Sequence, residues 1–268
     1  MFATQNYLSH LFNTYFLTNK MMVVKVTNNC NIKCEHCREN SGSGQDSILD
    51  WDVFKKTMDK IANSGWIAPL QGGEPTLYMD TVEKMINYQK SVGIKTVLYT
   101  NGWWAYDENI KNKILKINPD ILVISINQWT QKFIPIDRPK KILKDFEKEL
   151  PIVILSEVHD ENGPVIFKQL EFENVAHTPY TLSPVGRAKN LVYKNADFYK
   201  NEWNTCFQCG YTLELDHKIY SNCCAGTQGC CYGHYSDWDH NNSGGRLTVG
   251  EKCIKFKEFV QCLEQKKI

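Results

Sequence analysis

Three cysteines near the start of the chain are close enough in sequence to bind one metal centre. Cys30, Cys34 and Cys37 follow the strand-like run of residues 22–27 with the spacing C-x3-C-x2-C. Cysteine thiolates are the usual ligands of iron–sulfur clusters, so these three can hold three irons of a 4Fe-4S cluster and leave the fourth iron open to a reactant. The alternative to a 4Fe-4S cluster is that the three close cysteines form half of a zinc site.

A glycine-rich motif follows the second strand-like run of the chain. The apolar residues 66–70 lead through a glutamine into Gly72, Gly73, Glu74 and Pro75. Glycine has no Cβ, so a backbone that contains it can take unusual angles and approach a ligand closely. An ordinary turn would use the same residue types. The position directly after a strand favours a ligand-binding loop over a simple turn.

The two motifs, taken in order, resemble the signature of the radical S-adenosylmethionine (SAM) enzymes. Residues 30–37 read Cys-Asn-Ile-Lys-Cys-Glu-His-Cys, and this family has an aromatic residue or a histidine where His36 stands. The resemblance implies that SAM chelates the open iron through its amino and carboxylate groups. It also implies that the backbone of residues 72–75 receives the SAM amino group, and that an electron from the cluster cleaves SAM to methionine and a 5′-deoxyadenosyl radical.

Other residues are assigned to SAM binding by the same resemblance. The family contacts the ribose and the methionine part of SAM with small polar residues that end strands, here Thr100, Asn101, Ser125 and Asn127. His36 is expected to pack against adenine or the cluster. Arg187 stands where the resemblance places a contact to the SAM carboxylate, and a guanidinium suits bidentate pairing. A surface arginine is the alternative at that position.

Length, charge and hydrophobicity limit the class of protein. The 268 residues suffice for one full domain and a small appendage. The net charge of +1 gives no basic field for nucleic acid. No apolar run approaches the length of a membrane span, and the first residues lack the pattern of a secretory signal. We therefore expect a cytoplasmic protein without membrane or nucleic acid partners, whose eleven cysteines serve as metal ligands rather than in disulfides.

The segments that must position these residues alternate between strand and helix patterns. Strands are expected near residues 21–27, 66–70, 94–99, 120–126, 152–158 and 178–182. Helices are expected near residues 51–64, 79–92, 107–117 and 139–150. The consecutive apolar residues 121–124 are typical of a strand that is covered on both faces of a parallel sheet. The pattern predicts an α/β fold. The resemblance implies a partial (β/α)6 TIM barrel over residues 1–190, with its chemistry at the carboxyl ends of the strands.

Residues 191–268 have a different character and form a predicted second domain. Eight of the eleven cysteines lie from Cys206 onward, and Cys206, Cys209 and Cys223 have the spacing C-x2-C-x13-C. A short, loop-rich segment buries little apolar surface by itself, so a bound metal is expected to stabilise it. A predicted hairpin within residues 212–220 would bring Cys223 back beside Cys209.

This cysteine-rich segment resembles the SPASM and twitch extensions of radical SAM enzymes, which hold auxiliary 4Fe-4S clusters. We favour one auxiliary cluster, with the assigned ligands Cys206, Cys209, Cys223 and Cys230. Other candidates for the fourth ligand are Cys224, Cys231 and Cys253. A zinc ribbon is the alternative, because cysteine spacing alone does not distinguish zinc from iron–sulfur ligation. One departure from the extensions is that their usual Asp-Gly turn reads Asp216-His217.

The motifs predict a class of reaction and leave the substrate open. The radical would abstract hydrogen from an unactivated carbon, and an auxiliary cluster would accept an electron from the substrate radical. The first candidate is oxidative or C–H modification of a ribosomally made peptide. Dehydrogenation, epimerisation or rearrangement of a small molecule of sugar or nucleotide type is the second. A non-catalytic iron–sulfur or zinc redox sensor is the third, although a sensor needs no SAM site. A flavodoxin- or ferredoxin-type protein is the expected electron donor.

Overall fold

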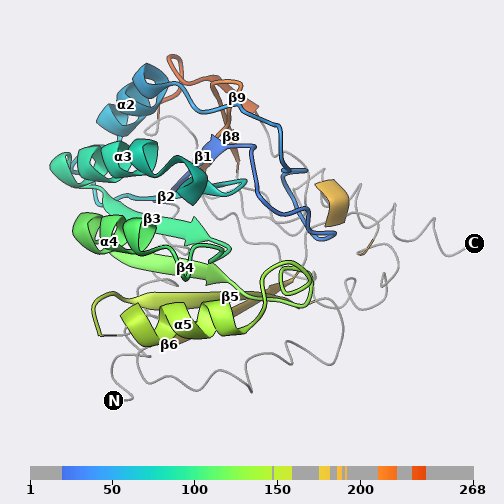
Figure 1. The fold of residues 1–268 in the computed structure, drawn as a ribbon. Coiled ribbons are helices and arrows are strands. Elements are labelled where there is room, and N and C mark those ends of the chain that lie inside the picture. Colours follow the sequence, from blue (N-terminus) through green and yellow to red (C-terminus); the bar gives the residue numbers. More distant parts are fainter. Residues whose placement is uncertain are drawn as a thin grey trace, which may run out of the picture.

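One sheet runs through the part of the chain that the structure describes. The computed structural model describes residues 20–146, 148–158, 175–181, 186–188, 191, 211–221 and 231–239. The strand order is β6-β5-β4-β3-β2-β1-β7-β8-β9 (Figure 1). The strands are β1 (Met22–Thr27), β2 (Ile67–Gly72), β3 (Lys95–Thr100), β4 (Ile121–Ser125), β5 (Ile152–Val158), β6 (Val175–Thr181), β7 (Tyr211–Leu213), β8 (Lys218–Ser221) and β9 (Cys231–His234). The helices are α2 (Trp51–Lys60), α3 (Met79–Ser91), α4 (Glu108–Ile117) and α5 (Asp137–Phe146), with the 3-10 helices η1 (Pro75–Tyr78) and η3 (Gly186–Ala188). None of the described helices is long and apolar enough to cross a membrane.

The first six strands form the barrel part of this sheet. β1 to β6 are parallel, and each pairs with the strand that follows it in the chain. Helices α2 to α5 connect the first five strands and cover one face of the sheet in chain order (Figure 1). Parallel neighbours need such crossovers, because a short hairpin cannot join them. The predicted α/β fold with a six-stranded parallel sheet is confirmed.

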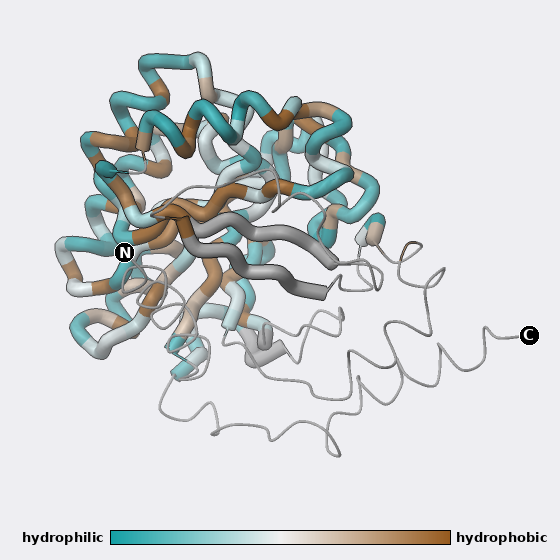
Figure 2. The backbone as a smooth tube through the Cα atoms, turned by 90° about the horizontal axis from the view of Figure 1, so that it is seen from below, coloured by the Kyte–Doolittle hydropathy of each residue, from teal (hydrophilic) through white to brown (hydrophobic). Residues whose placement is uncertain are grey.

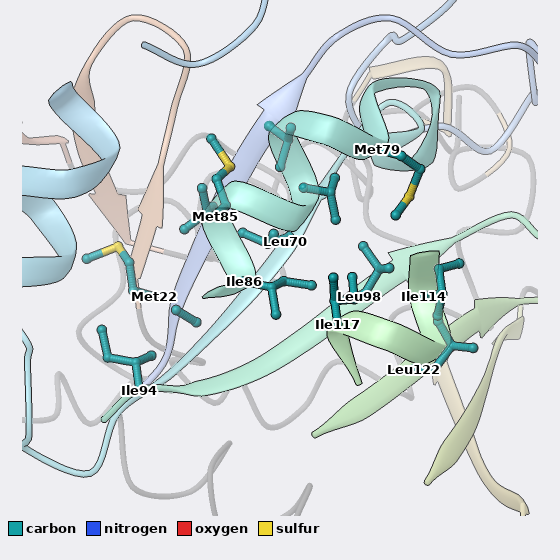
Figure 3. Close-up of a cluster of buried hydrophobic side chains, with 14 of the residues drawn as sticks. Met22, Leu70, Met79, Met85, Ile86, Ile94, Leu98, Ile114, Ile117 and Leu122 are labelled. Atoms are coloured by element: carbon teal, nitrogen blue, oxygen red, sulfur yellow. The ribbon is translucent and has the colours of Figure 1, made fainter. Parts of the chain in front are cut away.

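Hydrophobic side chains cover both faces of the parallel strands. In β1, Val24 and Val26 join a large cluster beneath the helices, whereas Val23 joins a smaller cluster with Val97 of β3 and Val123 of β4. Figure 3 shows part of the large cluster around α3, and Figure 2 shows hydrophobic residues concentrated on the strands. Side chains of a strand alternate between its two faces, which explains the two clusters. The consecutive apolar residues of β4 predicted this arrangement, and it is confirmed.

The first helix of the barrel begins at a cap and ends earlier than predicted. Asp50 accepts hydrogen bonds from two first-turn amides of α2 at 2.9 and 3.0 Å, as an N-cap residue does. The sequence pattern extended this helix to residue 64, but α2 ends at Lys60. Asn63 and Gly65 have φ angles of 53° and 74°. These left-handed conformations are incompatible with a continuing right-handed helix.

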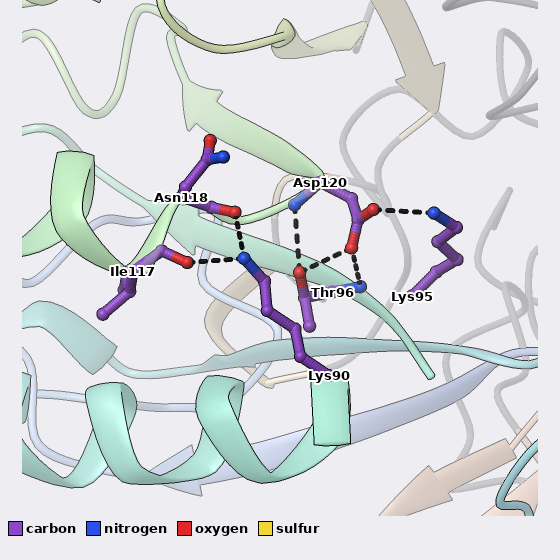
Figure 4. Close-up of polar contacts among 6 residues, drawn as sticks. All are labelled: Lys90, Lys95, Thr96, Ile117, Asn118 and Asp120. Carbon is purple, nitrogen blue, oxygen red and sulfur yellow. Dashed lines mark hydrogen bonds and ion pairs between the residues drawn. The ribbon is translucent and has the colours of Figure 1, made fainter. Parts of the chain in front are cut away.

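The amino ends of β3 and β4 are joined at the edge opposite the cysteines. Asp120 accepts hydrogen bonds from the amide and the hydroxyl of Thr96 at 2.8 Å and pairs with Lys95 at 2.9 Å (Figure 4). Although burial opposes ionisation, these donors hold the pKa of Asp120 below its usual value. Lys90 donates to the carbonyl of Ile117 at 2.6 Å. At this edge of a barrel such contacts serve stability rather than chemistry.

β7, β8 and β9 extend the sheet beyond β1. β7 pairs with β1 in parallel, with Met22 opposite Tyr211 and Val24 opposite Leu213, whereas β8 is antiparallel to both of its neighbours. The predicted hairpin is present as β7 and β8. Its residues Tyr211, Leu213 and Ile219 are buried in the same large cluster as the barrel strands. Apolar packing against the barrel therefore contributes stability that the cysteine pattern did not indicate.

The segment after β9 is anchored to the barrel by a lysine and an aromatic cluster. Nζ of Lys60, the last residue of α2, donates to three backbone carbonyls of residues 235–238 at 2.6 to 2.8 Å. Trp238 packs edge-on against Trp66 and Tyr211, with ring centroids 6.1 and 5.3 Å apart. The described parts of the C-terminal segment are thus packed directly onto the first strands of the barrel.

Candidate active site

The three cysteines lie in the loop that follows β1, at the carboxyl edge of the sheet. Cys30 and Cys34 are buried, with 8% and 5% of their surfaces exposed, and Cys37 is partly exposed. The amide of Cys30 donates to the carbonyl of Gly42 at 3.2 Å, and the amide of Cys37 donates to the carbonyl of Cys34 at 3.3 Å. These bonds fold residues 28–42, the cysteine loop, back over the end of β1.

The surroundings of Cys30 disfavour a free thiolate. Burial and the nearby carboxylate of Glu74 raise the pKa of the Cys30 thiol to about 12. A bare thiol there stays protonated at neutral pH, and a bound iron would replace the proton and compensate the buried charge. Among the described residues, no three His, Cys, Asp or Glu side chains surround a single point as ligands of one ion. In a 4Fe-4S cluster each thiolate binds a different iron.

The glycine motif is joined to the cysteine loop through backbone hydrogen bonds. The amide of Gly73 donates to the carbonyl of Thr27 at 2.7 Å, and the amide of Glu74 donates to the carbonyl of Asn29 at 2.8 Å. A Cβ built on Gly73 would overlap the carbonyl of Asn29, and Gly72 has a φ of 137°. From the sequence we expected these glycines to admit a ligand. The structure shows that they also admit the neighbouring backbone.

Glu74 lies at the centre of a buried polar network. It is 1% exposed, and its Oε1 accepts hydrogen bonds from the amide and the hydroxyl of Thr76 at 3.2 and 2.5 Å and from the hydroxyl of Thr100 at 2.9 Å. Its Oε2 accepts from the amide of Asn101 at 2.7 Å. Burial raises the pKa of this carboxyl, although the same hydrogen bonds oppose the shift. The carboxylate therefore joins the carboxyl ends of β2 and β3.

Two tryptophans are attached to this network through threonine hydroxyls. Nε1 of Trp103 donates to the hydroxyl of Thr76, and Nε1 of Trp104 donates to the hydroxyl of Thr100, both at 2.9 Å. Trp104 is buried and packs edge-on against Phe146, whereas Trp103 is partly exposed. The structure thus gives Thr100 internal hydrogen-bond partners. Its contact with SAM stays a prediction.

The side chain of Asn101 faces the cysteine loop. Its Nδ2 donates to Oδ1 of Asn31 at 2.9 Å and lies 3.9 Å from Sγ of Cys30, in hydrogen-bonding geometry. Its Oδ1 accepts from the amide of Trp103 at 3.0 Å. Asn101 is 7% exposed. The end of β3 therefore reaches the first cysteine directly.

His36 stacks on Trp129, a residue that the sequence patterns did not single out. The two buried rings have centroids 4.9 Å apart and planes 25° from parallel. Nδ2 of Asn127 lies 3.3 Å from Nε2 of His36, and Oδ1 of Asn127 accepts from the amides of Trp129 and Thr130. Ser125 ends β4 at the same edge and is partly exposed. The cysteine loop and the end of β4 therefore meet at His36.

Arg187 holds the cysteine loop from the side of β6. Its amide donates to the carbonyl of Cys37 at 2.9 Å, and its guanidinium donates to the carbonyls of Cys34 and Ser41 at 2.7 and 2.8 Å. Gly186 has a φ of 53° and packs so closely on the cysteine loop that a Cβ at this position would overlap carbonyl groups of the loop. The structure thus places Arg187 against the backbone of the cysteine loop.

A buried ion cluster connects the cysteine loop with the C-terminal hairpin. Lys25 of β1 is 9% exposed and pairs with Glu39 of the loop at 2.5 Å and with Glu214, which follows β7, at 3.1 Å. Although burial opposes the charge, the two carboxylates raise the pKa of Lys25. We did not single out these residues from the sequence. The signal was a lysine within an otherwise apolar strand, because such a charge is rarely buried unless it is paired.

The structure brings the predicted residues of the first site to one edge of the sheet. The cysteine loop follows β1, the glycine motif follows β2, and Asn101, Ser125 and Asn127 lie at the ends of β3 and β4. Pro75 is buried and begins η1. The assigned auxiliary ligands all lie outside the described residues: Cys206, Cys209, Cys223 and Cys230.

The parallel βα barrel has three cysteines after its first strand and a Gly-Gly-Glu-Pro loop after its second, which is the arrangement that the resemblance to the radical SAM enzymes implies. Residues 24–155 match the sequence model of the radical SAM superfamily. This range begins in β1, contains both motifs and ends in β5. Through this domain the chain belongs to the radical SAM superfamily.

Three curated relatives are similar to parts of the chain. The uncharacterized protein MJ0907 of Methanocaldococcus jannaschii is 29% identical over 117 residues, which are 40% of each chain. The putative peptide biosynthesis protein YydG of Bacillus subtilis is 22% identical over 221 residues, 76% of this chain and 69% of the relative. A probable GTP 3′,8-cyclase of Saccharolobus islandicus is 27% identical over 189 residues, 65% of this chain and 60% of the relative. The chain thus spans 40% to 69% of these relatives.

The fold is also found among solved structures. The structure of anSMEcpe with bound AdoMet and the Kp18Cys peptide has a TM-score of 0.57 and 17% sequence identity, and the likeness covers 91% of this chain and 83% of that one. At this identity the likeness concerns the fold alone. It agrees with the partial barrel that the described strands form.

Proposed function

We propose that the protein reductively cleaves SAM and that the resulting 5′-deoxyadenosyl radical abstracts hydrogen from a substrate. The observation that supports this most is the direct contact between the two motifs: the amide of Glu74 donates to the carbonyl of Asn29, the residue before Cys30. Both motifs lie within the segment that matches the superfamily. When bound, the 4Fe-4S cluster supplies the electron for the cleavage.

The residues of the carboxyl edge have separate roles in this proposal. Three thiolates hold the cluster, those of Cys30, Cys34 and Cys37. The backbone of residues 72–75 receives the SAM amino group, and Ser125 and Asn127 contact its ribose and methionine parts. Arg187 has five N–H donors, so it can bind the SAM carboxylate while it holds the cysteine loop. His36 packs beside adenine. A flavodoxin- or ferredoxin-type protein delivers the electron.

We propose a ribosomally made peptide as the substrate and an oxidative or C–H modification as the reaction. One comparison supports a peptide. YydG is named a putative peptide biosynthesis protein and aligns with 76% of this chain. A small molecule of nucleotide type is the second candidate, because the probable GTP 3′,8-cyclase aligns with 65% of this chain.

Mass spectrometry of the reaction mixture distinguishes the two substrates. The anaerobically reconstituted, reduced protein is incubated with SAM and either peptides encoded beside its gene or GTP. We expect one peptide to change in mass, in the simplest case by loss of two hydrogen atoms, with 5′-deoxyadenosine formed in step. The Cys34→Ala variant serves as the control without turnover. Consumption of GTP with unchanged peptides would favour the nucleotide substrate.

We further propose one auxiliary 4Fe-4S cluster in the C-terminal segment, held by Cys206, Cys209, Cys223 and Cys230. A triple variant with alanine at positions 30, 34 and 37 isolates it, because any remaining iron must be bound elsewhere. We expect this variant to retain about four irons per chain with a 4Fe-4S spectrum. About one zinc in place of this iron would indicate a zinc ribbon and would remove the proposed electron acceptor.

A further inference from the structure

The thiol of Cys30 belongs to a closed ring of contacts that passes through Glu74 and Asn101. The amide of Glu74 donates to the carbonyl of Asn29, the residue directly before Cys30, at 2.8 Å. The carboxylate of Glu74 accepts from the amide of Asn101 at 2.7 Å. The side chain of Asn101 returns to Sγ of Cys30 at 3.9 Å. Glu74 is thus connected to the first cysteine on both sides, through its backbone amide on one and through its carboxylate on the other.

The hydrogen bonds of Asn101 fix which end of its amide faces the sulfur. Oδ1 accepts from the amide of Trp103 at 3.0 Å, so the oxygen must point toward that donor. The NH2 group therefore points toward the cysteine loop, where Oδ1 of Asn31 accepts from Nδ2 at 2.9 Å. A primary amide has two N–H donors. One serves Asn31, and the second is available to Sγ of Cys30.

A donor at this position acts on a cluster ligand through electrostatics. Reduction adds a negative charge to a cluster, and part of that charge resides on the ligand sulfurs. An N–H dipole aimed at such a sulfur stabilises the reduced form more than the oxidised form, and hydrogen bonds to sulfur are among the factors that set cluster potentials. The effect is strong where water is excluded, and both Asn101 and Cys30 are buried.

We propose that Asn101, held in place by Glu74, donates an N–H···S hydrogen bond to the thiolate of Cys30 and raises the reduction potential of the first cluster. Asn101 is in this view a positioning residue that acts through Cys30. The inference rests on the proposed function, because it requires a cluster at the three cysteines.

The test measures the midpoint potential of the first cluster without SAM, by EPR-monitored redox titration. Asn101→Asp keeps the acceptor for Trp103 and replaces the donor with a carboxylate oxygen; Asn101→Ala removes both. Asn109→Asp, on the exposed surface of α4, adds the same charge as the first variant. We expect Asn101→Asp to lower the ratio of reduced to oxidised cluster at a fixed potential about tenfold, ~59 mV for a one-electron couple. Asn101→Ala should lower the midpoint potential by a smaller amount, and Asn109→Asp should leave the midpoint potential unchanged.

The outcomes separate this inference from the proposed function. A parent protein without a cluster at the three cysteines would refute the proposed function itself. A cluster with the same potential in the parent and in both Asn101 variants would overturn the inference alone. If those variants instead raised the SAM dissociation constant at an unchanged potential, Asn101 would contact SAM and not tune the cluster. Loss of the cluster from both variants would make Asn101 purely structural and would equally overturn the inference.

Discussion

Gly73 is the residue at which the two motifs of the site touch. Its amide binds the carbonyl of Thr27, and a Cβ on it would overlap the carbonyl of Asn29. An added methyl group must therefore move the glycine motif away from the cysteine loop. The cost of such overlap is large because both partners are backbone atoms of ordered segments and cannot rotate away.

We expect Gly73→Ala to destabilise the protein by about 1–3 kcal/mol and to lower iron binding at the cysteine loop. Gly42→Ala is the matched control, because a Cβ there has no atom within 4 Å although Gly42 lies in the same loop. Urea unfolding and iron analysis of both variants provide the measurements. Equal stability and iron content in the two variants would show that the backbone junction does not position the cysteines.

The sequence predicted which residues of the site could take part in chemistry, but not which of them contact one another. The spacing of Cys30, Cys34 and Cys37 was sufficient to predict a metal-binding loop after the first strand. The partners of Glu74 and Asn101 were not predictable in this way. They depend on which strand ends meet in space, and local spacing does not encode contacts between residues 27 or 71 positions apart.

At the scale of elements, the strands of the barrel were predicted best. The apolar run of β4 identified a strand covered on both faces, and the structure has it at Ile121–Ser125. The sixth strand was expected at 178–182 and is observed at Val175–Thr181, so it begins three residues earlier. Its proline and threonines give a weak hydrophobic pattern, which makes its bounds hard to predict. The parallel pairing of β7 with β1 was not predicted, because edge pairing between distant segments leaves no local signal.

The turn between β7 and β8 gives a test at this scale. His217 has a φ of 64°, a left-handed conformation that favours glycine. We compare His217→Gly with His217→Ala, because both remove the imidazole. The glycine variant should be more stable than the alanine variant by about 1 kcal/mol. Urea unfolding measures the difference, and equal stabilities would mean that the turn relaxes at no cost.

At the scale of the whole molecule, the C-terminal hairpin and the strands that carry the two motifs are parts of one sheet. Lys25 pairs with Glu39 of the cysteine loop and with Glu214 beside β7, and Lys60 binds the carbonyls after β9. These contacts attach described parts of the cysteine-rich segment to β1, to the cysteine loop and to α2. The sequence indicated the segment through its cysteines, and the structure shows how its described part is held.

The central claim is that the cysteine loop and the glycine motif form a SAM-cleaving centre. Its most direct test is the amount of 5′-deoxyadenosine formed from SAM by the anaerobically reconstituted, dithionite-reduced protein, compared with the Cys34→Ala variant. We predict that the parent forms 5′-deoxyadenosine and that the variant, which lacks one of the three thiolate ligands, forms none above background. Formation by the variant at the rate of the parent, or no formation by a parent that holds its cluster, would contradict the claim.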